Sequence, residues 1–192
     1  MSLYILVVLA AVLVVLVYFI VIYNQLVGIK HNVAKAWANI DVLLKQRHDE
    51  LPKLVETCRQ YMKFEQDTLE KVMKARAGVF AARESQDVGA LGRAEGALRM
   101  GLGNLYAVAE SYPELRTNES FLQLQSRITG LENAIADRRE FYNDSVNINN
   151  VRIEQFPDNI VARMFLFRPF DLLEFDQVEL KDVDVKQLFG QN

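Results

Sequence analysis

Apolar residues form one unbroken run near the start of the chain and then recur at helical spacing as far as about residue 154. The unbroken run, residues 3–22, contains no charged side chain. A helix rises about 1.5 Å per residue, so this run spans roughly 30 Å, the thickness of a bilayer's hydrocarbon core. A cleaved signal peptide is the alternative, but no basic residue precedes the run and no A-x-A site follows it. Residues 1–23 are therefore predicted to be a retained transmembrane anchor.

Beyond the anchor, apolar residues at three- and four-residue intervals predict four helices, at approximately residues 24–48, 51–83, 88–112 and 117–154. The anchor has no helix breaker at its end, so it is expected to continue into the first of them. Pro52 suits the first turn of a helix, which places a turn near residues 48–50, with Asp49 or Glu50 close to the start of the second helix. A single long, kinked helix is the alternative. The predicted fold is all-α, with an antiparallel up-and-down four-helix bundle over residues 24–155.

Residues 156–192 form a C-terminal extension that departs from the helical pattern. Its apolar part supplies four interface candidates: Ile160, Met164, Phe165 and Phe167. These side chains are expected to pack on the bundle, on a neighbouring subunit or on the membrane surface, where nearby arginines would meet lipid phosphates. Docking on protein is favoured over membrane contact, because anionic lipid would repel the neighbouring acids, which are Asp158, Asp171, Glu174 and Asp176.

Charge and cysteine content limit the function classes. The net charge is −3 with acids and bases interspersed, which gives no footprint for nucleic acid. A single cysteine, Cys58, excludes an intrachain disulfide framework. Four bases follow the anchor closely (Lys30, Lys35, Lys45 and Arg47), opposed by Asp41. The positive-inside rule therefore places the N-terminus outside and the bundle in the cytoplasm.

Several charged residues lie on or beside the apolar stripes of the predicted helices: Glu65, Arg76, Glu110, Glu132 and Arg139. Carboxylates inside a bundle can bind metal, but di-iron bundles use Glu-x-x-His pairs and this chain has none. Pairing between Glu and Arg that fixes helix register is the preferred interpretation. Nucleotide-binding, nucleophile-elbow and zinc-protease motifs are also absent from the sequence. Cys58 occupies a core position and is interpreted as a small buried hydrophobe.

Three further features carry structural predictions. Trp37 lies about 20 Å beyond Tyr23 on a continuous helix, so it is expected to be a core or interface anchor rather than a membrane-belt residue. Tyr112, Pro113 and Asn118 are expected to build the corner before the last helix, with Asn118 or Thr117 as its cap. Asn143, Asn147, Asn149 and Asn150 are interpreted as a solvated face with local capping, in slight preference to a polar recognition strip.

Specific strings resemble the LemA family of bacterial membrane-anchored proteins. They are YNQLV at 23–27, DVLLKQRHDELPKLVE at 41–56, LEKVMKAR at 69–76, AVAESYPELRTNESFLQLQ at 107–125, LENAIADRREFYNDSVNINN at 131–150 and FP at 156–157. The resemblance implies a single N-terminal anchor, a helical bundle and no established catalytic activity. Its motif residues here include Tyr61, Phe121, Tyr142, Phe156 and Pro157. The chain departs from the family at Phe64, where His is frequent, and at Lys53, where Asn is common.

The leading hypothesis is a non-enzymatic scaffold in the bacterial plasma membrane, self-associating as a homo-oligomer, with the bilayer contacted by residues 3–22 and no cofactor. One alternative is a carboxylate-based metal-binding or enzymatic bundle that uses Glu65, Glu110 and Glu132. Another is a receptor module that binds a peptide or a lipid beside the glycine-rich third helix. The identity of any other protein partner is not predicted.

Overall fold

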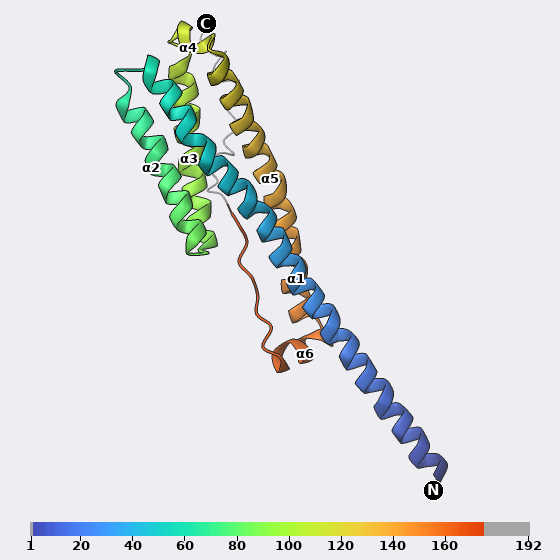
Figure 1. Ribbon diagram of the computed structural model, residues 1–192. Helices are drawn as coiled ribbons and strands as arrows, with labels where there is room; N and C mark the ends of the chain where they lie inside the picture. The colour runs from blue at the N-terminus through green and yellow to red at the C-terminus, as the bar shows by residue number, and fades with distance from the viewer. Residues whose placement is uncertain (1, 175–192) are drawn as a thin grey trace, which may run out of the picture. The chain divides into compact units, whose positions relative to one another are not determined.

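The computed structural model describes residues 2–174, and the described part of the chain is helical, without strands (Figure 1). The expectations for residues 175–192, including Asp176, lie outside the described residues. The helices are α1 Ser2–Tyr61, α2 Gln66–Glu84, α3 Val88–Ala109, α4 Pro113–Arg116, α5 Glu119–Glu154 and α6 Asp158–Met164. An all-helical chain with one long apolar N-terminal helix is therefore confirmed.

The first helix is longer than the sequence predicted. The apolar run does continue into the following helix, but no turn interrupts it near residues 48–50, and Pro52 lies inside α1. The predicted boundary between helices 24–48 and 51–83 is therefore wrong, and Asp49 is an exposed residue in the middle of a helix. The turn comes instead at residues 62–65, between α1 and α2. A single long helix through Pro52, the stated alternative, is the arrangement observed. The carbonyl that loses its helical partner to Pro52 accepts a hydrogen bond from Arg76 of α2 instead.

The other helix ends agree with local signals. Asp87 accepts a hydrogen bond from the Ala90 amide (2.8 Å) and so caps the start of α3. Asn118 does the same for α5, where its Oδ1 accepts from the Phe121 amide at 2.9 Å. The third helix ends at Ala109, three residues before its predicted end at residue 112, and Pro113 opens the short helix α4. Proline suits this first helical position, where its missing N–H is not needed.

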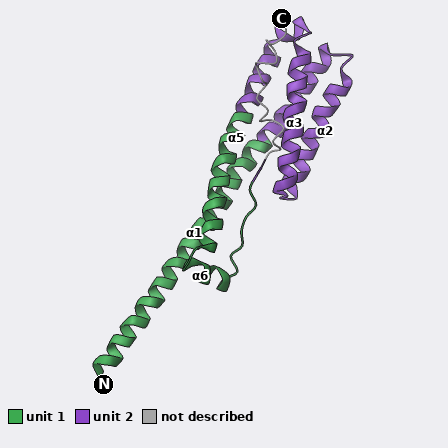
Figure 2. Cartoon of the chain, turned by 180° about the vertical axis from the view of Figure 1, so that it is seen from behind, with its two compact units in different colours: residues 1–45, 132–172 green, residues 46–131, 173–192 purple. Residues whose placement is uncertain are grey.

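The chain divides into two compact units (Figure 2). Unit 1 comprises residues 1–45 and 132–172, and unit 2 comprises residues 46–131 and 173–192. The boundary between the units falls within α1, after residue 45, and within α5, before residue 132. Each unit therefore contains part of both helices.

In unit 2, α2 and α3 pack along each other. Their buried apolar side chains repeat at intervals of three or four residues, or sums of these: Leu69, Val72 and Val79 on α2, and Leu91, Leu98, Leu102 and Leu105 on α3. A Cβ added at Gly101 of α3 would meet Val72 Cγ2 at 3.5 Å, so the glycine lies where the two helices approach closely.

In unit 1, α1 and α5 each carry a set of buried apolar side chains. Those of α1 are Ile22, Leu26, Val33, Ala36 and Ile40, and those of α5 are Ile135, Tyr142 and Val146. Trp37 is half-buried, and its ring lies 5.6 Å from the ring of Tyr142. The contact places Trp37 against α5, where the sequence-based prediction expected a packing residue.

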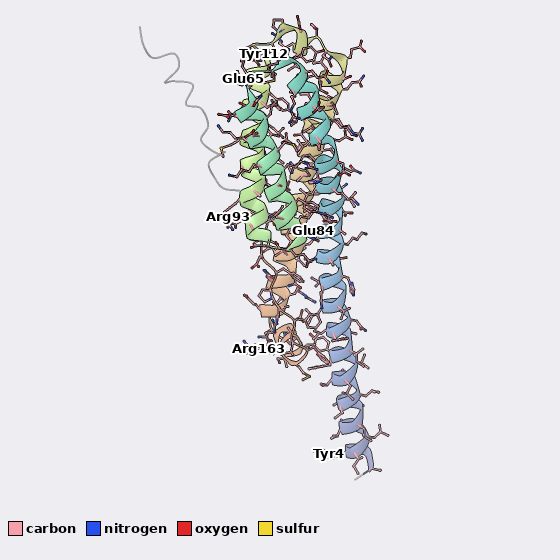
Figure 3. The ribbon with its side chains drawn as sticks, turned by 60° about the vertical axis from the view of Figure 1, so that its left-hand side comes forward. Tyr4, Glu65, Glu84, Arg93, Tyr112 and Arg163 are labelled. Atoms are coloured by element: carbon pink, nitrogen blue, oxygen red, sulfur yellow. The ribbon has the colours of Figure 1, made fainter. Side chains whose placement is uncertain are left out.

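The N-terminal part of α1 continues beyond α6 without another described segment beside it (Figure 1). Nearly all of its large apolar side chains are exposed, including Tyr4 at the far end (Figure 3). Among the described helices, α1 is the one long and apolar enough to cross a membrane, judged by length and composition.

We expect Gly103→Ala to raise the free energy of unfolding by about 0.5–1 kcal/mol, because glycine in a helix interior costs conformational entropy. No atom lies within 4 Å of the Cβ that the substitution adds, so the gain meets no steric cost. Gly101→Ala is the comparison, since its Cβ would make an ordinary van der Waals contact with Val72 on α2 (3.5 Å) and should also be tolerated. Urea unfolding followed by circular dichroism measures both changes, and a Gly103→Ala protein no more stable than the parent contradicts the prediction.

Candidate functional site

Unit 2 contains a buried ion pair between α1 and α3. Arg47 and Glu95 are 3% and 5% exposed, and a guanidinium nitrogen of Arg47 contacts Glu95 Oε1 directly. Each residue interrupts an apolar stripe, since Arg47 lies between Leu44 and Leu51 and Glu95 between Leu91 and Leu98. Charges this deep are tolerated only when they are paired, so the two residues fix how these helices face each other.

A second buried carboxylate, Glu50, lies less than one turn beyond Arg47 on α1. It is 6% exposed and has two cationic neighbours, Lys53 Nζ at 3.3 Å and Arg127 of α5 at 3.2 Å. Glu95 and Glu50 therefore each have a cation at hydrogen-bonding or ion-pair distance within the chain. This arrangement binds helices to one another and does not present a carboxylate to a substrate.

Arg76 of α2 completes the hydrogen bonding of α1 around Pro52. Proline has no N–H, so the carbonyl of His48, four residues earlier, loses its helical partner. Arg76 Nε donates to that carbonyl at 2.9 Å, and its guanidinium also lies 2.6 Å from His48 Nε2. The His48 ring packs 4.8 Å from the ring of Phe80. Burial, followed by the charge of Arg76, lowers the pKa of His48, so the imidazole stays neutral and can accept from Arg76.

The corner before α5 is built by hydrogen bonds between segments distant in sequence. Asn118 caps α5 with its oxygen, while its Nδ2 donates to the Tyr61 hydroxyl at the end of α1 (3.1 Å). The Tyr112 hydroxyl donates to Glu65 Oε1 at 3.5 Å, and these two residues are labelled in Figure 3. Burial and then the Glu65 carboxylate raise the pKa of Tyr112. Phe121 is buried beneath the cap. Glu65 and Tyr112 thus have a structural role at this corner.

The three carboxylates of the metal-site alternative occupy different environments. Glu65 is half-buried at the corner, Glu110 is exposed at the end of α3, and Glu132 is half-buried in α5. Within residues 2–174, no group of three or more His, Cys, Asp or Glu side chains lies close enough to hold a metal ion. Arg139 and Asn143 are half-buried side chains of α5 that interact with other groups of the protein.

Cys58 is fully buried in α1, as expected of a core residue. Burial raises the pKa of its thiol to about 12. The thiolate is the reactive form of cysteine, and its population at neutral pH is therefore negligible. Cys58 has the properties of a small apolar side chain rather than those of a nucleophile.

In unit 1, the asparagines late in α5 bind the chain's own C-terminal segment. Asn150 Nδ2 donates to the Phe170 carbonyl at 2.9 Å, and the Phe170 amide donates back to Asn150 Oδ1 at 3.0 Å. Asn149 Nδ2 donates to the Arg168 carbonyl at 3.3 Å, and the Tyr142 hydroxyl donates to the Asp171 carbonyl at 3.1 Å. The interpretation of these asparagines as a solvated face is wrong for Asn149 and Asn150, which recognise an extended backbone.

We expect Asn150→Ala to release the segment around Phe170 from α5. The substitution removes two hydrogen bonds, each worth about 0.5–1.5 kcal/mol. The measurement is hydrogen exchange of the Phe170 amide, which should become markedly faster. Asn147→Ala is the matched control, since Asn147 belongs to the same asparagine cluster but is exposed. If hydrogen exchange of the Phe170 amide accelerates equally in both variants, the loss of any asparagine from α5 frees the segment. The two hydrogen bonds between Asn150 and Phe170 would then not be the cause.

The short helix α6 packs on α1 at the end of the apolar run. Val161 and Ala162 are buried against Ile22 and Leu26, with Phe19 and Ile153 at the edge of the cluster. Arg152 of α5 holds this arrangement through two contacts: its Nε lies 2.8 Å from Asp158 Oδ2, and its guanidinium donates to Gln25 Oε1 at 2.6 Å. Pro157 precedes α6 as its N-cap, and Phe156 before it is exposed.

The four interface candidates lie on or just after α6. Ile160 and Met164 are exposed, as is one side of Phe165. The Phe165 ring lies 4.6 Å from the Tyr23 ring, and the half-buried Phe167 ring lies 6.1 Å from it. The part of the extension that is described therefore packs on its own chain, as one of the three alternatives proposed, while much of its apolar surface stays exposed.

A shallow groove of about 380 Å³ runs between α1 and α5 in unit 1. Its apolar walls come from Ile29, Phe141 and Ile148, and its polar lining includes Lys35 of α1 and Asp144 of α5. Phe141 and Ile148 are 53% and 54% exposed. Large apolar side chains exposed beside a groove are typical of a surface that binds another protein.

Two ion pairs were not predicted from the sequence: Arg47 with Glu95, and Arg152 with Asp158. Glu50 was expected at a helix start and is instead a buried residue within α1. For the first pair a signal was available, because each residue is a charge at the core position of an otherwise apolar stripe. The groove residues gave no comparable signal. Phe141 and Ile148 fit a helical pattern equally well as core residues, and only the packing shows that they face outward.

Comparison with known proteins supplies the family. The model of the LemA family matches residues 36–187. Magnetosome protein MamQ 2 of Paramagnetospirillum magneticum is 24% identical over 88% of this chain and 71% of its own length. Protein LemA of Metamycoplasma hominis is 25% identical over 86% of this chain and 74% of its own length. The chain belongs to the LemA family.

Proposed function

We propose that this protein is a non-enzymatic, membrane-anchored helical scaffold that self-associates through the groove between α1 and α5. The observation that carries the proposal is the groove itself, with Phe141 and Ile148 exposed along it. The proposal includes the antiparallel up-and-down arrangement of α1, α2, α3 and α5 as a bundle. The names of the relatives, protein LemA and magnetosome protein, denote no reaction, which agrees with a scaffold.

The anchor is the N-terminal part of α1. Its apolar side chains from Leu3 to Val21 are almost all exposed, so they need a solvent other than water. A bilayer is that solvent, and about 20 residues of helix span it. Lys30, Lys35 and Lys45 follow the span, which supports an N-terminus outside the bacterial plasma membrane and a helical remainder in the cytoplasm.

A second copy of the chain is the partner that best fits the groove. Copies anchored in one membrane carry the groove at the same height above it, and confinement to the membrane raises their effective concentration. The groove also carries opposite charges on its two sides, Lys35 on α1 and Asp144 on α5. In a two-fold dimer the groove of one chain faces the groove of the other. Lys35 of each chain can then pair with Asp144 of its partner.

Native mass spectrometry of the full-length protein from lipid nanodiscs tests the proposal. We expect dimers or larger oligomers for the parent protein, and monomers for Phe141→Asp with Ile148→Asp, because two buried carboxylates would face each other. Leu122→Asp is the matched control, an apolar residue of the same helix that is 47% exposed and lies outside the groove. A monomeric parent protein would overturn self-association, and an oligomer that survives the groove substitutions would overturn this interface.

A further inference from the structure

We infer that residues 156–168 form a membrane-surface collar, in which the exposed face of α6 and its flanks enters the lipid interface and nearby basic side chains contact anionic headgroups. This inference rests on the proposed anchor, because it needs residues 3–22 to span the bilayer. The sequence analysis favoured docking on protein for the same segment. Three features of unit 1 favour membrane contact instead: the position of α6, the character of its exposed face and the charge around it.

The first reason is position. The partners of α6 on α1 are Phe19, Ile22 and Leu26, and two of these three belong to the apolar span itself. If residues 3–22 cross the bilayer, Ile22 lies at its surface and Phe19 lies one turn inside it. A helix packed against both residues must lie at the level of the lipid headgroups. The collar is therefore continuous with the anchor.

The second reason is the character of the exposed face. Ile160 and Met164 are one turn apart on α6, and they are exposed on the side away from Val161 and Ala162. Phe156 precedes them at the same four-residue spacing, and Phe165 and Leu166 follow. These five side chains are between 47% and 78% exposed. Such a density of large apolar groups is costly in water and favourable in the interface of a bilayer.

The third reason is charge. The objection to membrane contact was the acids near the segment, but Asp158 is buried and paired with Arg152. Asp171 is held at Tyr142, eleven residues along α5 from Ile153, or about 17 Å away. That distance exceeds the Debye length of about 8 Å at physiological ionic strength. The exposed charges that remain close to the interface include the basic residues Arg163, Arg168 and Lys30, together with the acidic Glu154 at the end of α5, so basic side chains predominate there.

A groove beside the collar suits a lipid headgroup. It holds about 520 Å³ and is lined by Tyr23, Val27, Lys30, His31, Asn149 and residues 165–170. Aromatic rings and cations therefore occur together at the height where acyl chains give way to phosphates. Aromatic residues concentrate at this layer in membrane proteins, and each nearby Lys or Arg contributes about 1 kcal/mol of attraction to an anionic surface.

Depth measurement by fluorescence quenching tests the collar in the full-length protein. Single cysteines are placed in the Cys58→Ser background and labelled with bimane, and the protein is held in nanodiscs whose acyl chains carry bromine. Met164→Cys reports on the collar, Val14→Cys on the anchor, and Ala38→Cys on a part of α1 about 24 Å beyond Ile22. We expect brominated lipid to remove most of the emission at residues 14 and 164 and to leave residue 38 unaffected.

The three positions separate the two proposals. Quenching at residue 14 without quenching at residue 164 overturns the collar and leaves the anchor standing. If brominated lipid does not quench the label at residue 14, the anchor is overturned, and the collar is overturned with it. Protection of residue 164 from both brominated lipid and aqueous iodide would place it in a protein interface, which also overturns the collar.

A second measurement tests the headgroup contacts and does not depend on a label. Nanodiscs contain phosphatidylcholine and phosphatidylglycerol in equal amounts, and native mass spectrometry counts the lipids that stay bound. We expect the parent protein to retain phosphatidylglycerol in preference, and Arg163→Gln with Arg168→Gln to lose that preference. Arg116→Gln with Arg138→Gln removes the same charge from other exposed positions and should have no effect. Equal loss in both variants, or no preference in the parent, overturns the headgroup contact.

Discussion

Replacing Arg47 by Met should lower the free energy of unfolding by about 3–5 kcal/mol, because it leaves the buried Glu95 carboxylate without its partner. Breaking such a pair costs far more than the pair contributes, since the remaining charge stays out of water. Met keeps an apolar side chain of similar length in the core, so the loss reports on charge rather than on a cavity. Urea unfolding of the full-length protein in detergent, followed by circular dichroism, gives the value.

Two further variants identify the cause. Arg47→Met with Glu95→Leu should regain most of the lost stability, because a buried ion pair is often replaceable by apolar residues of similar volume. Arg59→Met is the control, since Arg59 pairs with Glu56 on the surface of the same helix. Exposed pairs contribute roughly 0–1 kcal/mol. If the double variant is no more stable than Arg47→Met alone, the cost arises from packing and the argument from charge fails.

Local signals predicted the later helices well. The ends of α3 and α5 follow from Asp87 and Asn118, whose side chains cap the helices that they precede. A cap needs only a short polar side chain just before an apolar repeat, and both can be read along the chain. The apolar run at residues 3–22 is equally local, and its length and composition suffice for the prediction of a span.

Interactions between segments distant in sequence could not be predicted in the same way. Asn149 and Asn150 lower the helix propensity of α5, which suggests a solvated end. Their amides instead bind the backbone of residues 168–170, and a backbone partner leaves no trace in the sequence. The same holds for the exposed face of α6, because Val161 and Met164 are both simply apolar until packing decides which of them is covered.

Pro52 is the clearest case of an interaction between distant segments, and it leads to the second prediction of a large change in stability. We expect Arg76→Met to cost about 1–3 kcal/mol, because the His48 carbonyl then has neither a helical partner nor the guanidinium that now donates to it. Lys74→Met on the exposed side of α2 is the control and should change stability little. The measurement is the same unfolding experiment in detergent.

A double-mutant cycle with Pro52→Ala isolates the cause. Alanine restores the N–H of residue 52, which can donate to the His48 carbonyl within α1, so the same Arg76→Met substitution should cost about 1 kcal/mol less in that background. Additive costs would mean that Arg76 acts through the His48 ring or through packing alone. A coupled result would mean that a residue of α2 supplies the hydrogen bond that Pro52 removes from α1. A helix with a proline at this position would then stay unbroken as far as Tyr61 because its tertiary partner replaces the missing bond.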